Sequence, residues 1–421
     1  MIQKKSILTN PNLNHMNIRK SIIIFVTLSI IPVLQGFDNN ASSIYRNLLF
    51  HNGSPVFYSQ LFNLVSFLAM SLGVLIGGVA IDKWNVKRFI LVDLICLSIF
   101  SFVLQFSDSY PIILVQRFIL AFSFGSLLIS FKVFLTEVLE SKNRGKLLFA
   151  FLNISIIGTL GYQLWLNYFE IDILNLSISY AQLQIPFIAL PLLVLLVFKY
   201  LSGPKKLEVN KSMSIKYLFR PKQRILVTIM IAMAILLSFA NSQLVSLMNI
   251  QVLAGYNNEY MLAIPTLSWF VAIVLGVLSI DYFGRTNLIN FGIVALIICS
   301  VFNIITSFAL SSSAISLVLL SLYNFIVLYA ISTTTVVVVL EYLPRPVRGR
   351  GMILFTLFCW LPNTINNGVI YPFIKQSSYQ VAIVSAISLT ALLIGWYLLR
   401  KRLIETKGLS LNDIKNKIEI E

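Results

Sequence analysis

Charge, cysteine and histidine are all scarce in this sequence. Only 11% of its 421 residues are charged, whereas a soluble domain carries about 25%. Three cysteines, Cys96, Cys299 and Cys359, lie within apolar runs, where we expect packing residues rather than a disulfide framework. His15 and His51 are isolated, which leaves no ligand spacing for a metal and no base beside a nucleophile. We therefore expect no catalytic residues, no cofactor and no metal site, and we do not expect an enzyme.

Apolar sequence, by contrast, runs nearly from end to end. The chain is 57% hydrophobic and its mean hydropathy is +0.85. A membrane-spanning helix needs ~20 apolar residues, and the absence of alternating polarity favours helices over strands. The expected spans are residues 20–49, 57–81, 89–107, 110–135, 147–169, 179–200, 225–254, 260–280, 287–309, 313–340, 352–374 and 380–400. The sequence therefore predicts an all-α integral membrane protein with twelve transmembrane helices in two six-helix halves.

The net charge of +16 is distributed by loop. Nearly all Lys and Arg fall in alternate loops between the apolar segments, as the positive-inside rule describes, which argues against a nucleic-acid surface. Arg19 and Lys20 precede the first span, and Arg400, Lys401 and Arg402 follow the last. We expect a multi-pass protein of the plasma (inner) membrane with both termini cytoplasmic, its first span retained rather than cleaved.

The longest internal polar segment divides the chain. Seven Lys and Arg between residues 202 and 224 face a single acid, Glu208. This segment is expected to be a solvated linker or to contact lipid head groups. The predicted division is an N-terminal half at 1–200, a cytoplasmic basic linker at 201–224, a C-terminal half at 225–400 and a cytoplasmic tail at 401–421.

Acidic and basic residues recur at matching places in the two halves, roughly 200 residues apart. Glu137 is followed after six residues by Arg144-Gly145, and Glu341 is followed in the same way by Arg348-Gly349. A second pair of clusters begins at Asp82 and at Asp281, after the second and eighth spans. Parallel halves of this kind are typical of a transporter whose site lies between them near the bilayer midplane.

Several motifs in order resemble the major facilitator superfamily, and within it the sugar porter family. The matching stretches are Asp281-Tyr-Phe-Gly284-Arg285, Arg117 to Gly125 with Glu137 and Arg144-Gly145, Glu405-Thr406-Lys407-Gly408, and Gly36-Phe37-Asp38. The resemblance covers most of the chain. It implies that family's fold, alternating access by rocking of the halves, and a small-molecule substrate.

Asp38 lies in an apolar run, where an ionised carboxylate costs roughly 2.5–3.5 kcal/mol. In proton-coupled relatives the matching Asp is the protonation site and the fourth-helix Arg is its partner, so the resemblance assigns proton coupling to Asp38 and Arg117. Arg117 lies ~10 Å into its span at 1.5 Å per residue, and Asp38 lies at comparable depth. The alternative is a fixed structural ion pair.

The loop clusters are expected to act as a cytoplasmic gate. Salt bridges between the halves would hold the cytoplasmic side shut while the outside is open, although each exposed pair contributes only about 0–1 kcal/mol. The alternative is that these residues only set topology. The predicted gate residues are Asp82, Glu137, Arg144, Asp281, Arg285, Glu341 and Arg348.

The region expected to bind substrate departs from the family pattern. Val336 stands where sugar-binding relatives carry a Trp, and Ser332-Thr333 replaces a Gly-Pro. The residues predicted to bind substrate could instead have a structural role, the Trp as a packing aromatic and the amides as partners in interhelical hydrogen bonds. The predicted substrate-binding residues are Gln35, Asn39, Thr159, Gln163, Asn241, Gln243, Trp360 and Asn363.

Lys132 occupies the family's fourth-helix Pro position. It could snorkel to the cytoplasmic interface, pair with Asp93 of the third span, or hold an anionic substrate.

We therefore expect a secondary active transporter that moves a small polar metabolite, with a sugar or polyol favoured, by proton symport. An organic-ion or other metabolite carrier of the same superfamily and an uncoupled facilitator stay open as alternatives. A non-transporting nutrient sensor is disfavoured by a tail of thirteen residues after Gly408. The expected partners are the substrate, protons and the lipid bilayer, without nucleic acid, and the expected state is a monomer.

Overall fold

Helices lie over every segment that the hydropathy predicted to span the membrane, in a computed structural model of the chain. The structure describes the backbone of residues 18–51, 56–84, 86–104, 110–168, 176–200, 215–220, 223–253, 259–309, 313–365 and 379–420. Side chains are described for residues 22–38, 61–62, 64–84, 86–100, 102, 111–161, 186–198, 216–220, 223–244, 247, 267–308, 315–360 and 379–418.

The first half contains six spans. Its helices are α1 (Ile18–His51), α2 (Val56–Lys83), α3 (Val86–Leu104), α4 (Tyr110–Val138), α5 (Arg144–Asn153), α6 (Ser155–Tyr168) and α7 (Leu176–Tyr200). The predicted fifth span is divided into α5 and α6 at Ile154.

The second half repeats this number of spans. Its elements are α8 (Arg224–Leu253), α9 (Glu259–Phe283), α10 (Arg285–Ala309), α11 (Ser313–Ile326), the π-helical η3 (Val327–Ser332), α12 (Thr333–Tyr342), α13 (Arg348–Ile365) and α15 (Gln380–Leu399). Two short 3₁₀ turns, η1 (Ile215–Tyr217) and η4 (Arg345–Val347), precede α8 and α13, and α16 (Leu411–Ile420) follows the last span. The predicted tenth span is thus built from α11, η3 and α12 together.

Length and composition alone qualify six helical segments of the described residues as membrane-spanning. They lie in α2, α4, α8, α10, the α11–α12 run and α15. Shorter apolar helical stretches are Ile22–Asp38, Pro186–Phe198 and Leu267–Phe283, within α1, α7 and α9. The predicted domain boundaries stay predictions, because most of the linker at 201–224 lies outside the described residues.

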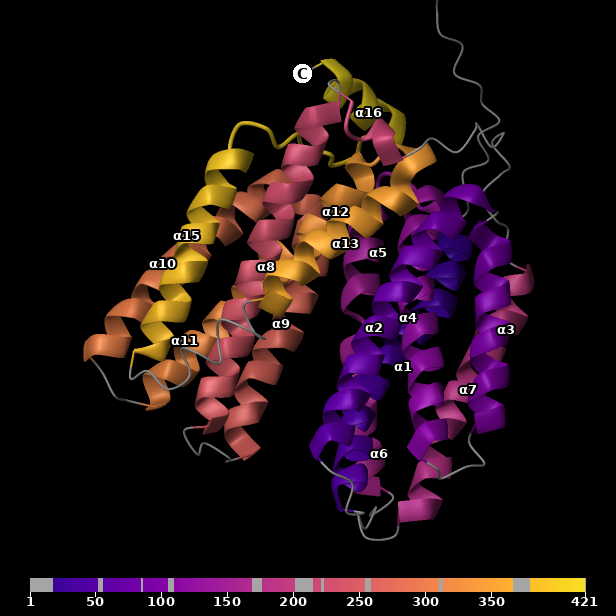
Figure 1. The fold of residues 1–421 in the computed structure, drawn as a ribbon. Coiled ribbons are helices and arrows are strands. Elements are labelled where there is room, and N and C mark those ends of the chain that lie inside the picture. The colour runs from indigo at the N-terminus through magenta and orange to yellow at the C-terminus, as the bar shows by residue number, and fades with distance from the viewer. Residues whose placement is uncertain are drawn as a thin grey trace, which may run out of the picture.

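The two halves form separate bundles, coloured indigo to magenta and red to yellow in Figure 1. They adjoin near α16 and diverge toward the opposite end (Figure 1). Contacts between the bundles run mainly from α13 to α2 and from α5 to α9. We call the end of the molecule that carries α16 the α16 end.

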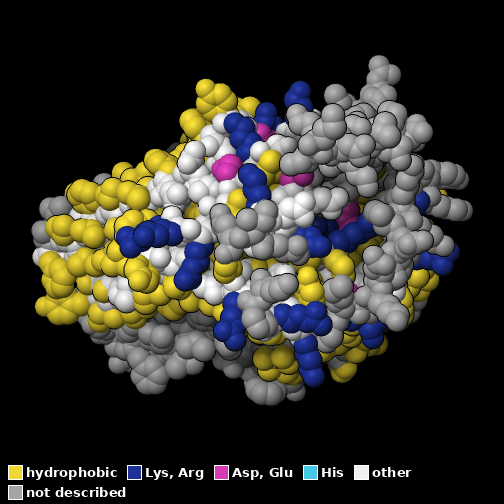
Figure 2. Space-filling view, turned by 90° about the horizontal axis from the view of Figure 1, so that it is seen from above, with side chains coloured by type: hydrophobic (Ala, Val, Ile, Leu, Met, Phe, Trp, Pro, Cys, Tyr) yellow, Lys and Arg dark blue, Asp and Glu magenta, His cyan; other side chains and the backbone are white. Residues whose placement is uncertain are grey.

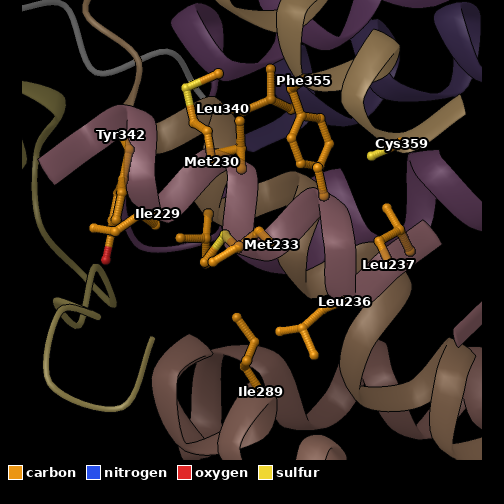
Figure 3. Packing of buried hydrophobic residues seen from close by; sticks show 14 of the residues in the cluster. Ile229, Met230, Met233, Leu236, Leu237, Ile289, Leu340, Tyr342, Phe355 and Cys359 are labelled. Carbon is orange, nitrogen blue, oxygen red and sulfur yellow. The ribbon is translucent and has the colours of Figure 1, made fainter. Parts of the chain in front are cut away.

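The buried apolar residues form two clusters, each centred on one half and each extending into the other. In the second half, Met230, Met233 and Leu236 of α8 pack toward Ile289 of α10 and Leu340 of α12 (Figure 3). A separate cluster of buried Ile, Leu and Phe joins α1, α3, α4 and α7 in the first half. Because lipid is as apolar as these side chains, close packing rather than hydrophobic transfer holds such helices together.

Glycines bring the backbones of α1 and α6 close together in the first half. A Cβ on Gly36 would meet the backbone carbonyl of Ser155, and a Cβ on Gly158 would meet that of Val33. Glycine at these two facing positions lets the helix backbones approach directly. This approach fixes the height of Asp38, two residues after Gly36, against the fifth span.

The α16 end carries many Lys and Arg residues, and side chains there cap the starts of α10 and α16. Lys and Arg side chains are spread across this face, whereas apolar side chains cover the flanks (Figure 2). The carboxylate of Glu405 accepts hydrogen bonds from the backbone amides of Arg285 and Thr286, the first residues of α10. Ser410 and Asp413 form a capping box at the start of α16.

Candidate functional site

A buried ion pair joins α1 to α4. The Nη1 atom of Arg117 lies 2.5 Å from Oδ2 of Asp38. The two residues are 9% and 2% exposed, so both are removed from bulk water and from lipid. The sequence predicted comparable depths for these two groups, and in the structure they form an ion pair.

Two groups of α2 complete the surroundings of Arg117. Its Nε donates a hydrogen bond to Oγ of Ser66 at 2.6 Å. The guanidinium lies 5.2 Å from the ring centre of Phe62, one helical turn earlier on the same helix. A hydroxyl and an aromatic face therefore stabilise this cation in addition to the carboxylate. Sequence reasoning missed both residues, because neither type is distinctive in an apolar helix.

One oxygen of Asp38 is free. Its Oδ1 is buried and accepts no hydrogen bond from the residues that the structure describes, while Oδ2 is bound to Arg117. An unpaired carboxylate oxygen in a low-dielectric interior is costly, and adding a proton would relieve the cost. The geometry thus leaves one atom at which a proton could be received.

At the α16 end, each half caps a helix of the other. Asp82 of α2 accepts hydrogen bonds from the backbone amides of Gly349 and Arg350 at 2.9 and 3.0 Å, at the start of α13. Asp281 of α9 accepts one from the amide of Lys146 at 3.0 Å, at the start of α5. The first amides of a helix lack partners within it and favour an anion. Asp82 and Asp281 therefore occupy matching positions in the two halves, and each caps a helix of the other half.

Ion pairs reinforce this seam. Glu137, at the end of α4, lies 3.2 Å from both Arg345 and Arg348 of the second half. Its counterpart Glu341, at the end of α12, lies 3.7 Å from Arg144 of the first half and 3.5 Å from Arg285 of its own. Within the second half, Arg285 also lies 2.8 Å from Asp281.

The predicted gate residues thus come together at one seam, and their role there stays a prediction. The seam also contains groups that were not predicted as gate residues. Arg350 lies 3.7 Å from Asp82, and Thr406 of the tail donates a hydrogen bond to Glu341.

Burial lowers the pKa values of two arginines in the seam. It lowers the pKa of Arg348 to about 10, with Glu137 opposing the change. It also lowers the pKa of Arg144, which Glu341 opposes. Both arginines sit at helix starts outside the apolar spans. At a pKa of about 10, Arg348 stays protonated at neutral pH, so this part of the seam keeps its charge.

A further contact between the halves lies deeper. Nδ2 of Asn153 donates a hydrogen bond to Oγ1 of Thr333 at 2.8 Å, and both residues are buried. Asn153 ends α5 at the break before α6, and Thr333 begins α12 directly after the π-helical η3. Irregular turns of this kind often occur at functional sites. Nothing in local periodicity marks them.

Two of the predicted substrate-binding residues make contacts within their own half. Oγ1 of Thr159 lies 3.5 Å from the carbonyl oxygen of Gly36, between α6 and α1. Gln243 is fully buried, and its amide donates to Ser385 and accepts from Ser300, each at 3.1 Å. Since both ends of this amide are used, the geometry of Gln243 favours the alternative of an interhelical hydrogen bond.

Three of the other predicted substrate-binding residues have side chains that the structure describes. Gln35 and Asn241 are half-buried on α1 and α8. Trp360 of α13 is also half-buried, and its ring lies 5.8 Å from that of Phe67 on α2, across the two halves. The side chains of Asn39, Gln163 and Asn363 lie outside the described residues.

Asp93, a possible partner of Lys132 in the sequence analysis, is bound to a different residue of α4. Oγ of Ser126 donates a hydrogen bond to the carboxylate of Asp93, which is 7% exposed. No ion pair joins Asp93 to Lys132, both of which the structure describes. Within the described residues no cluster of His, Cys, Asp and Glu could hold a metal ion.

Comparison with known proteins adds the following. A model of the Major Facilitator Superfamily matches residues 22–365. The MFS proton:xylose symporter XylE, in a structure bound to 6-bromo-6-deoxy-D-glucose, is similar over 95% of this chain and 99% of its own, with 16% identity and a TM-score of 0.76. The E. coli fucose:proton symporter FucP, in the outward conformation, is similar over 92% and 100%, with 16% identity and a TM-score of 0.72. XylE from E. coli in an inward open conformation has 17% identity, 94% and 99% coverage and a TM-score of 0.63. Among curated proteins nothing matches.

Proposed function

This chain belongs to the major facilitator superfamily, and on that premise we propose that it is a secondary active transporter of a small polar metabolite. A sugar or polyol is the favoured substrate and proton symport the favoured mode. The protein works by alternating access, with the α16 end and both termini in the cytoplasm of a plasma (inner) membrane. The family and the twelve-helix fold, both predicted from the sequence, are confirmed.

The observation that carries the coupling proposal is the free oxygen of Asp38 beside its ion pair with Arg117. A proton arriving at Asp38 removes its negative charge and with it the attraction for Arg117. Arg117 keeps its hydroxyl and aromatic partners on α2, so it is not left exposed to an apolar interior. Contact between α1 and α4 then weakens, and the halves can rearrange around the substrate.

The seam at the α16 end supports the other part of the cycle. Four acids of the two halves accept amides or pair with arginines there. In this arrangement the cytoplasmic side is shut. Several moderate contacts can bias a two-state equilibrium and can still be broken. The named substrates of XylE and FucP, xylose and fucose, support a sugar as the favoured substrate here.

Uptake into proteoliposomes tests the proposal. Wild-type protein should accumulate its substrate against a gradient when an inward proton gradient is imposed. Asp38→Asn should abolish this accumulation, because the amide cannot take part in a protonation cycle, while substrate counterflow persists. Unchanged accumulation in Asp38→Asn would remove Asp38 from the mechanism. Counterflow by wild type without proton-driven accumulation would instead indicate an uncoupled facilitator.

A further inference from the structure

Lys132 lies on a helix that other helices enclose. α4 contacts α1, α2, α3 and α5 of its own half and α12 and α13 of the other. Lys132 is nevertheless half-buried rather than fully buried. Its side chain therefore lies among protein neighbours and is not a lipid-facing residue of the outer surface.

The place of Lys132 on α4 favours a side chain that leans away from the α16 end. Lys132 lies six residues before the end of α4, ~9 Å at 1.5 Å per residue. Helical side chains lean toward the N-terminus of their helix, which for α4 is the end opposite α16. On its side facing the second half, α4 contacts α13, the helix that carries Cys359 eleven residues from its start. These observations argue against snorkelling, the first alternative left open by the sequence.

The amine of Lys132 has no counterion in the part of the chain that the structure describes. No carboxylate forms an ion pair with it. Asp93 is hydrogen-bonded by Ser126, six residues before Lys132 and thus about 120° away around α4. Arg117, fifteen residues before Lys132, is only about 60° away. Lys132 therefore shares the face of α4 that carries the proposed coupling pair.

An isolated ammonium in a low-dielectric interior is costly unless a charge partner is present. We propose that the carboxylate of the transported substrate is this partner, so that the substrate is a polyhydroxylated acid, such as a sugar acid, rather than a neutral sugar. This inference rests on the proposed function and narrows its substrate class. One amine balances one carboxylate, whereas a phosphate group, with about two charges, would require a second cation, and Arg117 is already paired.

The departures from the family pattern agree with this substrate. Val336 stands where the resembled family carries a Trp, so one aromatic face for a neutral ring is absent, and Lys132 stands at that family's Pro position, which adds a positive charge. The proposed site therefore offers one aromatic contact fewer to a neutral ring and one cation more to an anion.

The test uses pairs of ligands that differ in the acid group. The full-length protein, purified in detergent, is titrated with D-gluconate and D-glucitol, and with D-glucuronate and D-glucose, by isothermal calorimetry. Wild type should bind at least one acid tenfold or more tightly than its neutral partner. Lys132→Met should reduce that affinity at least tenfold and leave the neutral ligands unchanged, while Lys132→Arg retains it. Lys142→Met, at an exposed position after α4, is the matched control.

Three results would overturn the inference: equal affinity for acid and neutral ligands, an undiminished acid affinity in Lys132→Met, or binding of D-glucose 6-phosphate in place of both acids. A fold check accompanies the titration. Lys132→Met removes an unpaired charge, so its thermal stability should equal or exceed that of wild type. Uptake assays keep the two proposals apart: acid binding without transport contradicts the proposed function alone, and proton-driven transport of neutral sugars that Lys132→Met leaves intact contradicts only the assignment of Lys132.

Discussion

Asp38 of the first half and Gln243 of the second are both buried polar residues, but they differ in how completely they are hydrogen-bonded. Asp38 is left with one unsatisfied oxygen, whereas both ends of the Gln243 amide are hydrogen-bonded. A fully satisfied group is suited to holding helices together, and an incompletely satisfied one is suited to changing state. Gln243 joins α8 to α10 and α15, all within one half.

This assignment gives a prediction for Gln243→Leu. The leucine removes two interhelical hydrogen bonds and leaves Ser300 and Ser385 without this partner. Such bonds contribute about 0.6 kcal/mol each on average, and up to about 1.7, so unfolding free energy should fall by roughly 1–3 kcal/mol. Thermal unfolding in detergent measures this loss, and substrate affinity should be unchanged. Normal stability with weakened binding would return Gln243 to the substrate site.

The sequence could reveal Asp38 and Arg117 but not the role of Gln243. A charge in an apolar run is conspicuous, and its depth follows from counting residues along the helix. The face on which an amide lies is not visible when the helix is apolar on every side, because no polar stripe marks its orientation. Sequence reasoning therefore found the two residues of the Asp38–Arg117 ion pair and could not choose between the two alternatives for Gln243.

At the level of elements, the sequence predicted where the helices lie but not where they are irregular. The hydropathy located all twelve spans, yet the break at Ile154 and the π-helical Val327–Ser332 lie inside two of them. Both irregularities adjoin the Asn153–Thr333 contact between the halves. Tertiary packing, rather than local composition, selects such turns, so hydropathy along the chain does not predict them.

The close approach of α1 and α6 supplies a prediction at this scale. Gly158→Ala places a methyl group against the backbone of Val33, and overpacking of this kind costs about 1–3 kcal/mol. Gly161→Ala, one turn later on the same helix, meets no neighbouring atom and should be neutral or stabilise by up to about 1 kcal/mol. Melting temperatures of the two variants in detergent provide the comparison. Equal destabilisation by both would contradict the packing described here.

At the scale of the whole molecule, the seam at the α16 end should set the balance between conformations. Glu137→Gln leaves Arg348, which is 2% exposed, without its carboxylate. Removing one member of a buried pair costs about 3–5 kcal/mol, so the closed form should lose population. Arg345 is 40% exposed in its side chain, and Arg345→Gln should change the balance by only about 0–1 kcal/mol.

Spin labels at Lys142→Cys and Lys401→Cys, in a background without the three native cysteines, would measure this shift. Both positions are exposed at the α16 end, Lys142 after α4 of the first half and Lys401 directly after α15, the last span of the second. Double electron–electron resonance should show a longer-distance population that grows in Glu137→Gln and hardly changes in Arg345→Gln. Identical distance distributions in wild type and Glu137→Gln would mean that the seam does not control opening.

Asp82 completes the first turn of α13, and Asp281 completes the first turn of α5. Neither half therefore contains all the groups that its own helices need. If the chain were divided in the linker and the pieces were produced separately, each would present an uncapped helix start together with a carboxylate shaped for the other. The pieces should recognise each other in one mutual orientation, and co-expression should restore what either fragment lacks.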